Sequence, residues 1–363
     1  MQFGSLYCLV QMEMNEEKIF SLKKTGILVI AIGLFMFLLY LYLFVPFGDF
    51  VSNIRQANPF YYSLAFAAML LSVAFYSLVW QRLLHILSVK SSFWKAFQFV
   101  WVGSFVDLLV PAESISGDIS RVYLMSKEAG EDAGKVVASV IGHRVLTTTI
   151  TLGGLVISSI YFAVKYNPPF FVMEFVGVIG VVTLISLFLI FLLSKRRQTT
   201  VKIVDRLVGL LVRFSRGRWQ FERLKKQADK MLKAFHDGID ALGVQPHRLV
   251  LPVSLAIVAW LLDLLIAVLV FHALSTRVSF SAIVIVYSIS VAIQTIPLGI
   301  PGEIGLLDVL MTSLYTLLGI PIAVSAVATL LVRILTLWVR LLIGGLTVQW
   351  LGIKGLKKLN PSN

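Results

Sequence analysis

The sequence has one cysteine, few charged residues and a large apolar excess. Cys8 is the only cysteine among 363 residues, so one chain cannot form a disulfide or a CxxC metal or redox site. Only 14% of the residues are charged and 58% are hydrophobic, which is too apolar for a soluble core with a polar surface. The composition therefore predicts an integral membrane protein.

The sequence also lacks the signatures of common enzyme classes. Walker A, GxSxG, HExxH and DxD-type metal motifs are missing, and the 5 histidines have no metal-ligand spacing. His143 is expected at membrane depth beside Arg144, but adjacent helical side chains point about 100° apart. We interpret His143 as a core or cavity histidine, with a proton relay as the alternative. We expect no enzymatic activity, catalytic residue, cofactor or metal site.

The positive charge is concentrated in one segment. Residues 195–248 hold 14 lysines and arginines against 5 acidic residues, within a net charge of +13. In a soluble protein this excess would suggest nucleic acid as a partner, but here it lies between apolar runs. The positive-inside rule places such a loop in the cytoplasm, and basic clusters beside both termini predict that these are cytoplasmic too. We therefore expect a multi-pass plasma-membrane protein that does not bind nucleic acid.

Apolar runs of membrane-crossing length are separated by prolines and bases. Spanning helices are expected at 26–45, 60–84, 136–164, 170–193, 249–274 and 323–351. The first is interpreted as an anchor, because no small-residue cleavage site follows it. Two other runs, 93–110 and 280–296, stop at Pro111 and Pro297. Polar or Gly/Pro-rich sequence follows each run, which predicts re-entrant hairpins near 93–127 and 280–319.

The remaining segments are a tail at 1–25, the basic loop 195–248 and a tail at 352–363. In the loop, apolar residues recur every three or four positions from Phe221 to Leu242, which predicts an amphipathic helix. This helix either lies on the anionic inner leaflet or packs on the membrane bundle as a solvated linker.

The two membrane halves, 26–194 and 249–351, contain the same order of landmarks. A proline ends an apolar run, a Gly-acid-Ile triplet follows, and a long apolar helix then carries one central arginine. Two pairs of segments match. The first pair is Gly117-Asp118-Ile119 and Gly302-Glu303-Ile304, and the second is Arg144-Val145-Leu146-Thr147 and Arg333-Ile334-Leu335-Thr336. If both hairpins return to the side they came from, every basic cluster lies inside and the halves are inverted. If the hairpins crossed the membrane, the basic loop would lie outside, so the hairpin interpretation is preferred.

The sequence thus predicts an all-α polytopic membrane protein of two inverted repeats, each with three spanning helices and a re-entrant hairpin, where the span 170–193 counts as the first of the second repeat. Arg144 and Arg333 lie well inside their helices, where an arginine costs about 2.5–3.5 kcal/mol unless it meets a partner or water. They are either structural salt bridges to Asp107, Asp118, Asp263 or Glu303, or a pair that holds an anionic headgroup. Arg340 either extends this polar track or snorkels alone.

Helix-breaking residues and charges coincide in the two hairpins. The breakers, expected to let the backbone turn at depth, are Pro111, Gly117, Pro297, Gly299, Pro301, Gly302 and Gly305. The charged candidates for substrate contact, besides the two arginines, are Glu113, Asp118, Arg121 and Glu303. An ordinary interfacial loop is the alternative, and it fits the first hairpin better than the second.

The sequence resembles the UPF0104 family, the lysylphosphatidylglycerol synthase transmembrane region or flippase-like domain. The resemblance rests on P-x-E-x-x-x-G-D-x-x-R-x-Y-L at 111–124, on VVASVIGHR after it, and on IPGEIGLLD at 300–308. The last motif has Glu303 and Asp308 where the family has glycine and glutamate. In the bacterial synthases, the resemblance implies a domain that flips aminoacylated lipid made by a fused cytosolic transferase. We expect no such transferase here, because the tail 352–363 is too short.

Three functions are compatible with these features. The first is a flippase or transporter that moves an anionic or lipid-linked substrate between leaflets, with membrane lipids as its partners. The second is a membrane-embedded lipid-headgroup transferase, against which the missing motifs count. The third is a membrane scaffold that docks a cytosolic lipid-modifying enzyme through the basic loop. The sequence predicts no oligomeric state.

Overall fold

A computed structural model describes residues 47–109, 116–130, 133–166, 170–195, 236–240, 246–295 and 300–359, besides a few isolated positions. These residues form helices and turns without a strand, which confirms the all-α class. Several predictions lie outside them: the span 26–45, both tails in whole or part, most of the amphipathic helix, and Pro111, Glu113, Pro297 and Gly299.

Among the described residues, 4 helices are long and apolar enough to cross a membrane. They are α4 (Pro59–Ile86), α7 (Ala133–Tyr166), α11 (Val250–Ala273) with the preceding turn, and α14 (Ile322–Arg333) with its continuation. They confirm membrane-crossing helices near four of the predicted ranges. A fifth predicted span corresponds to α8 (Phe170–Lys195).

The continuation of α14 changes its helical geometry beside the candidate arginine. A π-helical segment, η3 (Ile334–Val339), follows Arg333 directly and leads into α15 (Arg340–Leu359). Segments of π-helix are rare and occur frequently at functional sites. The helix also continues beyond residue 351, where the predicted span ends, so the end of the apolar stretch does not end the helix.

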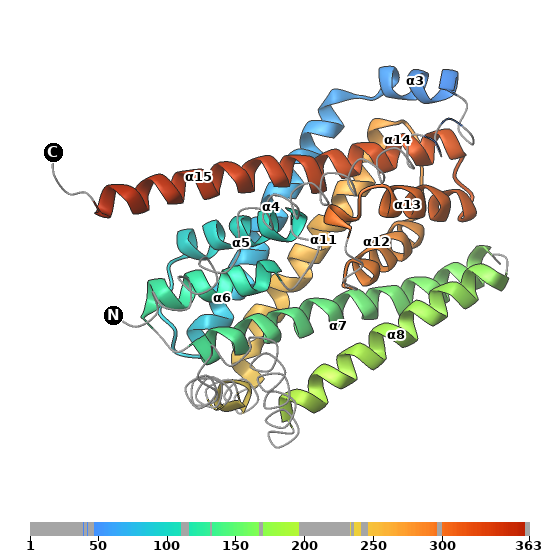
Figure 1. The fold of residues 1–363 in the computed structure, drawn as a ribbon. Coiled ribbons are helices and arrows are strands. Elements are labelled where there is room, and N and C mark those ends of the chain that lie inside the picture. The colour runs from blue at the N-terminus through green and yellow to red at the C-terminus, as the bar shows by residue number, and fades with distance from the viewer. Residues whose placement is uncertain are drawn as a thin grey trace, which may run out of the picture.

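Each predicted hairpin contains two helices. The first has α5 (Phe93–Leu109) and α6 (Ser116–Ala129), which pack side by side, and the second has α12 (Phe280–Gln294) and α13 (Leu306–Leu317) (Figure 1). Asp107, near the end of α5, accepts hydrogen bonds from the Gly117 N–H (2.6 Å) and the Ser116 hydroxyl (3.0 Å) at the start of α6. One carboxylate therefore joins the two helices.

The antiparallel helices α4 and α11 form the centre of the molecule (Figure 1). Asn58 caps α4 by accepting the Phe60 N–H (2.9 Å), and its own N–H donates to the Ala273 carbonyl (2.8 Å). The start of α4 is thereby joined to the end of α11. Around this pair, α5 packs along α15, and α12 packs along α7.

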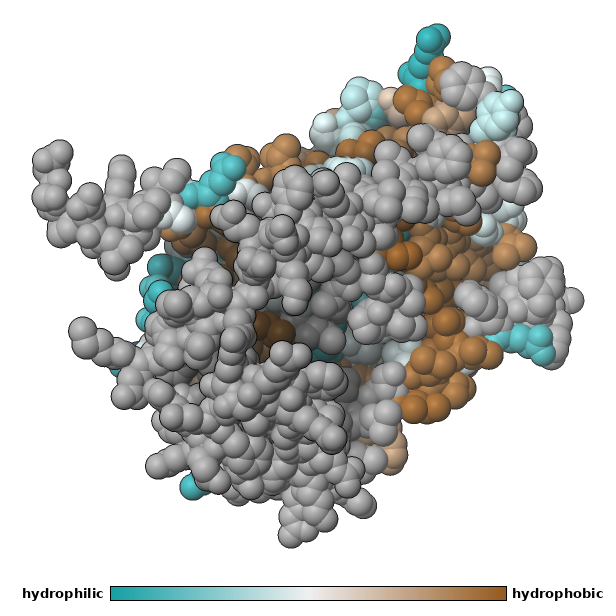
Figure 2. Space-filling view, viewed as in Figure 1, coloured by the Kyte–Doolittle hydropathy of each residue, from teal (hydrophilic) through white to brown (hydrophobic). Residues whose placement is uncertain are grey.

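The outer faces of the helices are apolar. Figure 2 shows hydrophobic side chains over much of the visible described surface, with hydrophilic ones mainly toward its edges. Exposed large hydrophobic residues on α7 and α8 include Val156, Ile157, Ile160, Val164, Val178, Val181, Leu184 and Phe188. A soluble monomer rarely exposes such a contiguous patch. Together with the long apolar helices, this surface shows a membrane protein.

The close contact between α15 and α5 depends on the absence of a side chain at Gly344. A Cβ there would lie 2.7 Å from the Phe105 Cβ and 2.8 Å from the Trp101 carbonyl oxygen. We predict that Gly344→Ala lowers the free energy of unfolding by about 1–3 kcal/mol through overpacking. Thermal unfolding in detergent measures this loss, with Gly352→Ala as control because nothing lies within 4 Å of its Cβ position. Equal stability of the two variants would contradict the prediction.

Candidate functional site

A cavity of about 370 Å³ lies among α4, α5, α6, α7, α11, α12, α13 and the α14–α15 helix. Both halves of the chain therefore contribute to its wall. The charged side chains that line it are Asp107, Asp118, Arg121, Arg144, Asp263, Arg333 and Arg340. Hydroxyl and aromatic groups fill the space between them, including Ser72, Tyr76, Ser104, Thr147, Thr151, Trp260, Tyr287 and Ser290.

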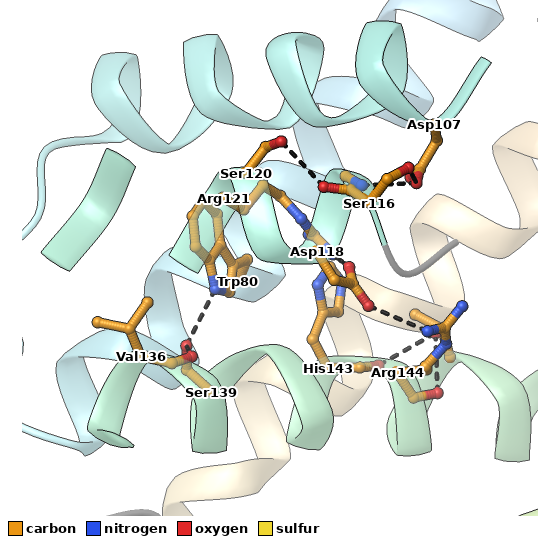
Figure 3. Close-up of polar contacts among 12 residues, drawn as sticks. Trp80, Asp107, Ser116, Asp118, Ser120, Arg121, Val136, Ser139, His143 and Arg144 are labelled. Atoms are coloured by element: carbon orange, nitrogen blue, oxygen red, sulfur yellow. Dashed lines mark hydrogen bonds and ion pairs between the residues drawn. The ribbon is translucent and has the colours of Figure 1, made fainter. Parts of the chain in front are cut away.

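Asp118 joins two of the predicted site arginines. It lies in the first turn of α6 and forms ion pairs with Arg121 on the same helix and with Arg144 on α7 (3.0 Å) (Figure 3). The side chain of Arg144 is 27% exposed, whereas that of Arg121 is 7% exposed. Arg144 thus reaches the cavity beside a carboxylate, Asp118, that a second arginine also contacts.

Aromatic rings hold Arg121 in place. Its guanidinium lies 5.6 Å from the Tyr76 ring centre and 5.2 Å from that of Trp80. Trp80 in turn donates to the Ser139 hydroxyl on α7 (3.0 Å) (Figure 3). The cation–π contacts and the ion pair with Asp118 together fix the guanidinium beside the cavity.

His143 lies in the core beside this cluster. Its side chain is fully buried, and its ring centre is 4.1 Å from that of Tyr76. Within the described part of the chain, neither ring nitrogen has a hydrogen-bond partner, and the cavity lining does not include the residue. This placement fits the interpretation as a core histidine better than the proton relay.

Arg333 is held differently from Arg144. Its side chain is 5% exposed; it donates to the Asp308 carboxylate (3.1 Å) and to the Gly302 carbonyl (2.5 Å). Asp308 also accepts the Gly305 N–H (2.8 Å) at the start of α13. Arg333 therefore lines the cavity and also stabilises the turn before α13 through its contacts with Gly302 and Asp308.

That turn needs its glycines. Gly302 and Gly305 have φ angles of 60° and 86°, a region that side chains disfavour. Pro301 and Gly302 belong to η2 (Pro301–Glu303) and Gly305 directly precedes α13, so these three predicted breakers lie in a turn. Glu303 also has a positive φ of 41° and is fully buried.

The repeated Gly-acid-Ile triplets are not equivalent in three dimensions. Asp118 pairs with Arg144, but the partner of Arg333 is Asp308 rather than Glu303. The cavity lining includes Asp118 and does not include Glu303. A sequence signal for Asp308 exists: the acid-to-arginine separation is 25 residues for Asp308 and Arg333, against 26 for Asp118 and Arg144.

A second cluster centres on Asp263. Its carboxylate accepts hydrogen bonds from Ser72 on α4 (2.6 Å), Tyr287 on α12 (3.1 Å) and Arg340 on α15 (3.2 Å). One side chain of α11 therefore connects four helices at the cavity wall. The sequence indicated Asp263 only as a partner for the other arginines, although a lone acid inside the long apolar run 249–274 is itself a signal.

Three residues that line the cavity each have a buried side-chain nitrogen without an acceptor among the described residues. Within the described part of the chain, the buried Arg121 Nη1, Trp260 Nε1 and Arg340 Nε have no hydrogen-bond partner. Buried donors in folded proteins are normally satisfied, so an unused donor needs an explanation. Trp260, which packs against Gly154 on α7, was not identified from the sequence.

The apolar exterior, the spanning helices and the charged cavity define a polytopic helical membrane protein. Residues 26–344 match the family described as lysylphosphatidylglycerol synthase TM region, and the chain belongs to this family.

Relatives with similar sequences have the name UPF0104 membrane protein. One from Methanothermobacter thermautotrophicus is 24% identical over 93% of this chain and 99% of its own length. Another from Pyrococcus horikoshii is 21% identical, covering 82% of this chain and 89% of its own. A third from Methanocaldococcus jannaschii is 24% identical, covering 86% and 90%. No solved structure matches the chain.

Proposed function

We propose that the protein translocates an anionic lipid, or a lipid-linked anionic group, between the two leaflets of the plasma membrane. The observation that supports this most is that three residues lining one cavity, Arg121, Trp260 and Arg340, each have an unused buried donor. A phosphate group offers several acceptor oxygens, and guanidinium groups bind it through charge-assisted hydrogen bonds. In this proposal the protein catalyses no covalent step.

The cavity size suits a headgroup rather than a whole lipid. Its volume of about 370 Å³ is near the lower end of the range for small-ligand pockets. A diacyl lipid would not fit, so its chains remain in the bilayer beside the apolar helix faces while the headgroup crosses. We infer that Arg144, the more exposed arginine of the Asp118 cluster, contacts the headgroup.

We further propose that the two halves are inverted copies that alternate around this cavity. The packing of the described helices supports the proposal: α4 is antiparallel to α11, α5 packs on α15, and α12 packs on α7. Inverted halves produce such reciprocal contacts, and secondary transporters place their substrate site at the interface of the halves.

Proteoliposomes test the proposed function. We expect the purified protein to move a trace of fluorescent phosphatidylglycerol from the inner to the outer leaflet of phosphatidylcholine vesicles. An impermeant quencher added outside reports each molecule that arrives there. Movement of the anionic probe should exceed that of the matched phosphatidylcholine probe and that in protein-free vesicles. If both probes remain in place, or move equally fast, the proposed function is wrong for this class of headgroup.

Cysteine labelling tests the proposed topology, in which the basic loop and both termini are cytoplasmic. In a Cys8→Ser background, single cysteines replace Arg216 in the loop and Lys357 near the C-terminus. We predict that an impermeant thiol reagent labels both positions only after the membrane is opened, because the positive-inside rule retains basic segments in the cytoplasm. Labelling of either position in intact cells would contradict the inverted-hairpin scheme.

A further inference from the structure

Asp263 is a carboxylate inside the spanning helix α11, and it lines the cavity with a side chain that is 22% exposed. Charged side chains are costly at membrane depth, and they commonly belong to ion or proton pathways. The three donors to Asp263 come from α4, α12 and α15. A change in its charge therefore alters the contacts of four helices around the cavity.

The pairing of Asp263 with Arg340 creates a competition. Arg340 donates through Nη2 to Asp263 (3.2 Å), and its buried Nε has no partner in the described part of the chain. An anionic headgroup at Arg340 would place a second negative charge beside the carboxylate. Like charges in one site raise the proton affinity of a carboxylate. Binding of an anion at Arg340 and protonation of Asp263 therefore favour each other.

We propose that Asp263 is the proton-coupling site of the transporter: it takes one proton from water when an anionic headgroup replaces it at Arg340. The proton and the headgroup cross together and are released together on the other side. A single negative charge and one proton make this step electroneutral. The inference rests on the proposed function and adds the source of energy to it.

The charges around Asp263 support this choice. Four other helices that pack against α11 each place one titratable or charged residue at the cavity: Tyr76 on α4, Arg144 on α7, Tyr287 on α12 and Arg333 on α14. Arg340, at the start of α15, also lines the cavity. None of them is a second carboxylate.

The other two cavity carboxylates have different bonding. Asp118 is shared by two arginines, Arg121 and Arg144. Asp107 accepts from neutral groups that join α5 to α6, and no described cation forms an ion pair with it that an anion could displace. Asp263 is paired with one described arginine, Arg340, which has an unused Nε donor. Asp118 also has a partner with an unused donor, Arg121, but a second arginine holds it as well.

Imposed gradients test the coupling in vesicles with the fluorescent phosphatidylglycerol probe. At one proton per lipid, a difference of one pH unit should enrich the probe about tenfold in the leaflet that faces the more alkaline solution. Reversal of the gradient should reverse the enrichment, whereas a potassium diffusion potential without a pH difference should have no effect. A wild-type protein that moves the probe without responding to pH overturns the coupling and leaves the proposed function intact. A protein that moves no probe overturns both.

Two variants identify the residue. Asp263→Asn retains acceptor and donor groups but cannot exchange a proton, so the tenfold enrichment should fall to none whatever the rate at which this variant moves the probe. Asp263→Glu should restore the response to pH. Glu128→Gln, which removes a carboxylate from the exposed Lys95 pair (3.0 Å), is the control and should respond like wild type. A full pH response in Asp263→Asn would overturn the assignment of the proton to Asp263.

Discussion

Replacement of Arg144 with glutamine should strongly slow the movement of anionic lipid and leave the protein folded. Glutamine removes the charge and nearly preserves the length, so the headgroup loses a charge-assisted hydrogen bond. Such a bond is worth about 1.5–3 kcal/mol, which corresponds to an about 10- to 150-fold slower translocation rate if it acts in the transition state. The measurement is the rate at which labelled phosphatidylglycerol reaches the quencher in proteoliposomes.

The protein should remain stable because Asp118 does not lose its only partner. In the Arg144→Gln variant, Asp118 still has the buried Arg121 beside it, and the cavity end of the side chain is partly exposed. The thermal midpoint in detergent should therefore remain close to that of wild type. Arg144→Lys should recover part of the rate, because an ammonium group cannot make the planar two-bond contact with a phosphate.

A matched control shows whether the effect is specific to the Arg144 charge or follows from the loss of any positive charge. Lys95→Gln removes a base from the exposed pair with Glu128, away from the residues that line the cavity, and should translocate lipid at the wild-type rate. A well-folded Arg144→Gln protein that translocates as fast as the Lys95→Gln protein would exclude Arg144 from the binding site.

The sequence predicts the helices well because its strongest signal is local. Long apolar runs closed by prolines and bases correspond to α4, α7 and α11, and Asn58 before Pro59 marks the start of α4 correctly. The acid–arginine pair of Asp118 and Arg144 was also among the predicted alternatives. These features depend on residues that are close in sequence or on one repeated motif, so their prediction requires no three-dimensional information.

The rest of the site depends on how the helices pack. Nothing in the sequence of α4 or α12 shows that Ser72 and Tyr287 meet at Asp263, because these contacts join residues 191 and 24 positions apart across helix interfaces. Trp260 reaches the cavity because Gly154 lets the two helices approach. The π-helical segment after Arg333 carries no local sequence signal at all.

The repeat itself was misleading at one position. The repeated Gly-acid-Ile motifs align Glu303 with Asp118, and this alignment suggested equivalent roles for the two acids. In the structure, a turn with positive φ angles at three residues places Glu303 in the core and Asp308 against Arg333. A motif alignment compares only the order of residues, whereas the partner in an ion pair depends on where the backbone turns. The aligned residue and the actual partner therefore differ where the turns of the two halves differ.

Replacement of Arg333 with glutamine should, in contrast, destabilise the protein strongly. Its guanidinium contacts Asp308 and the Gly302 carbonyl, and all three residues are buried. Removal of one partner from a buried ion pair costs about 3–5 kcal/mol, because the remaining charge has no compensation. We expect a large fall in the thermal midpoint in detergent, measured beside the Arg144→Gln protein, whose midpoint should hardly change.

A second substitution shows whether the stranded charge causes this loss. Asp308→Asn in the Arg333→Gln protein removes the buried negative charge, and the asparagine oxygen can still accept the Gly305 N–H that begins α13. The double variant should therefore be more stable than Arg333→Gln alone. If the main role of Arg333 were instead to contact the headgroup, the opposite pattern would follow. Arg333→Gln would have a wild-type thermal midpoint and no translocation, and Asp308→Asn would not change that midpoint. That pattern would assign Arg333 to the substrate, and a fall in stability reversed by the second substitution would assign it to the turn before α13.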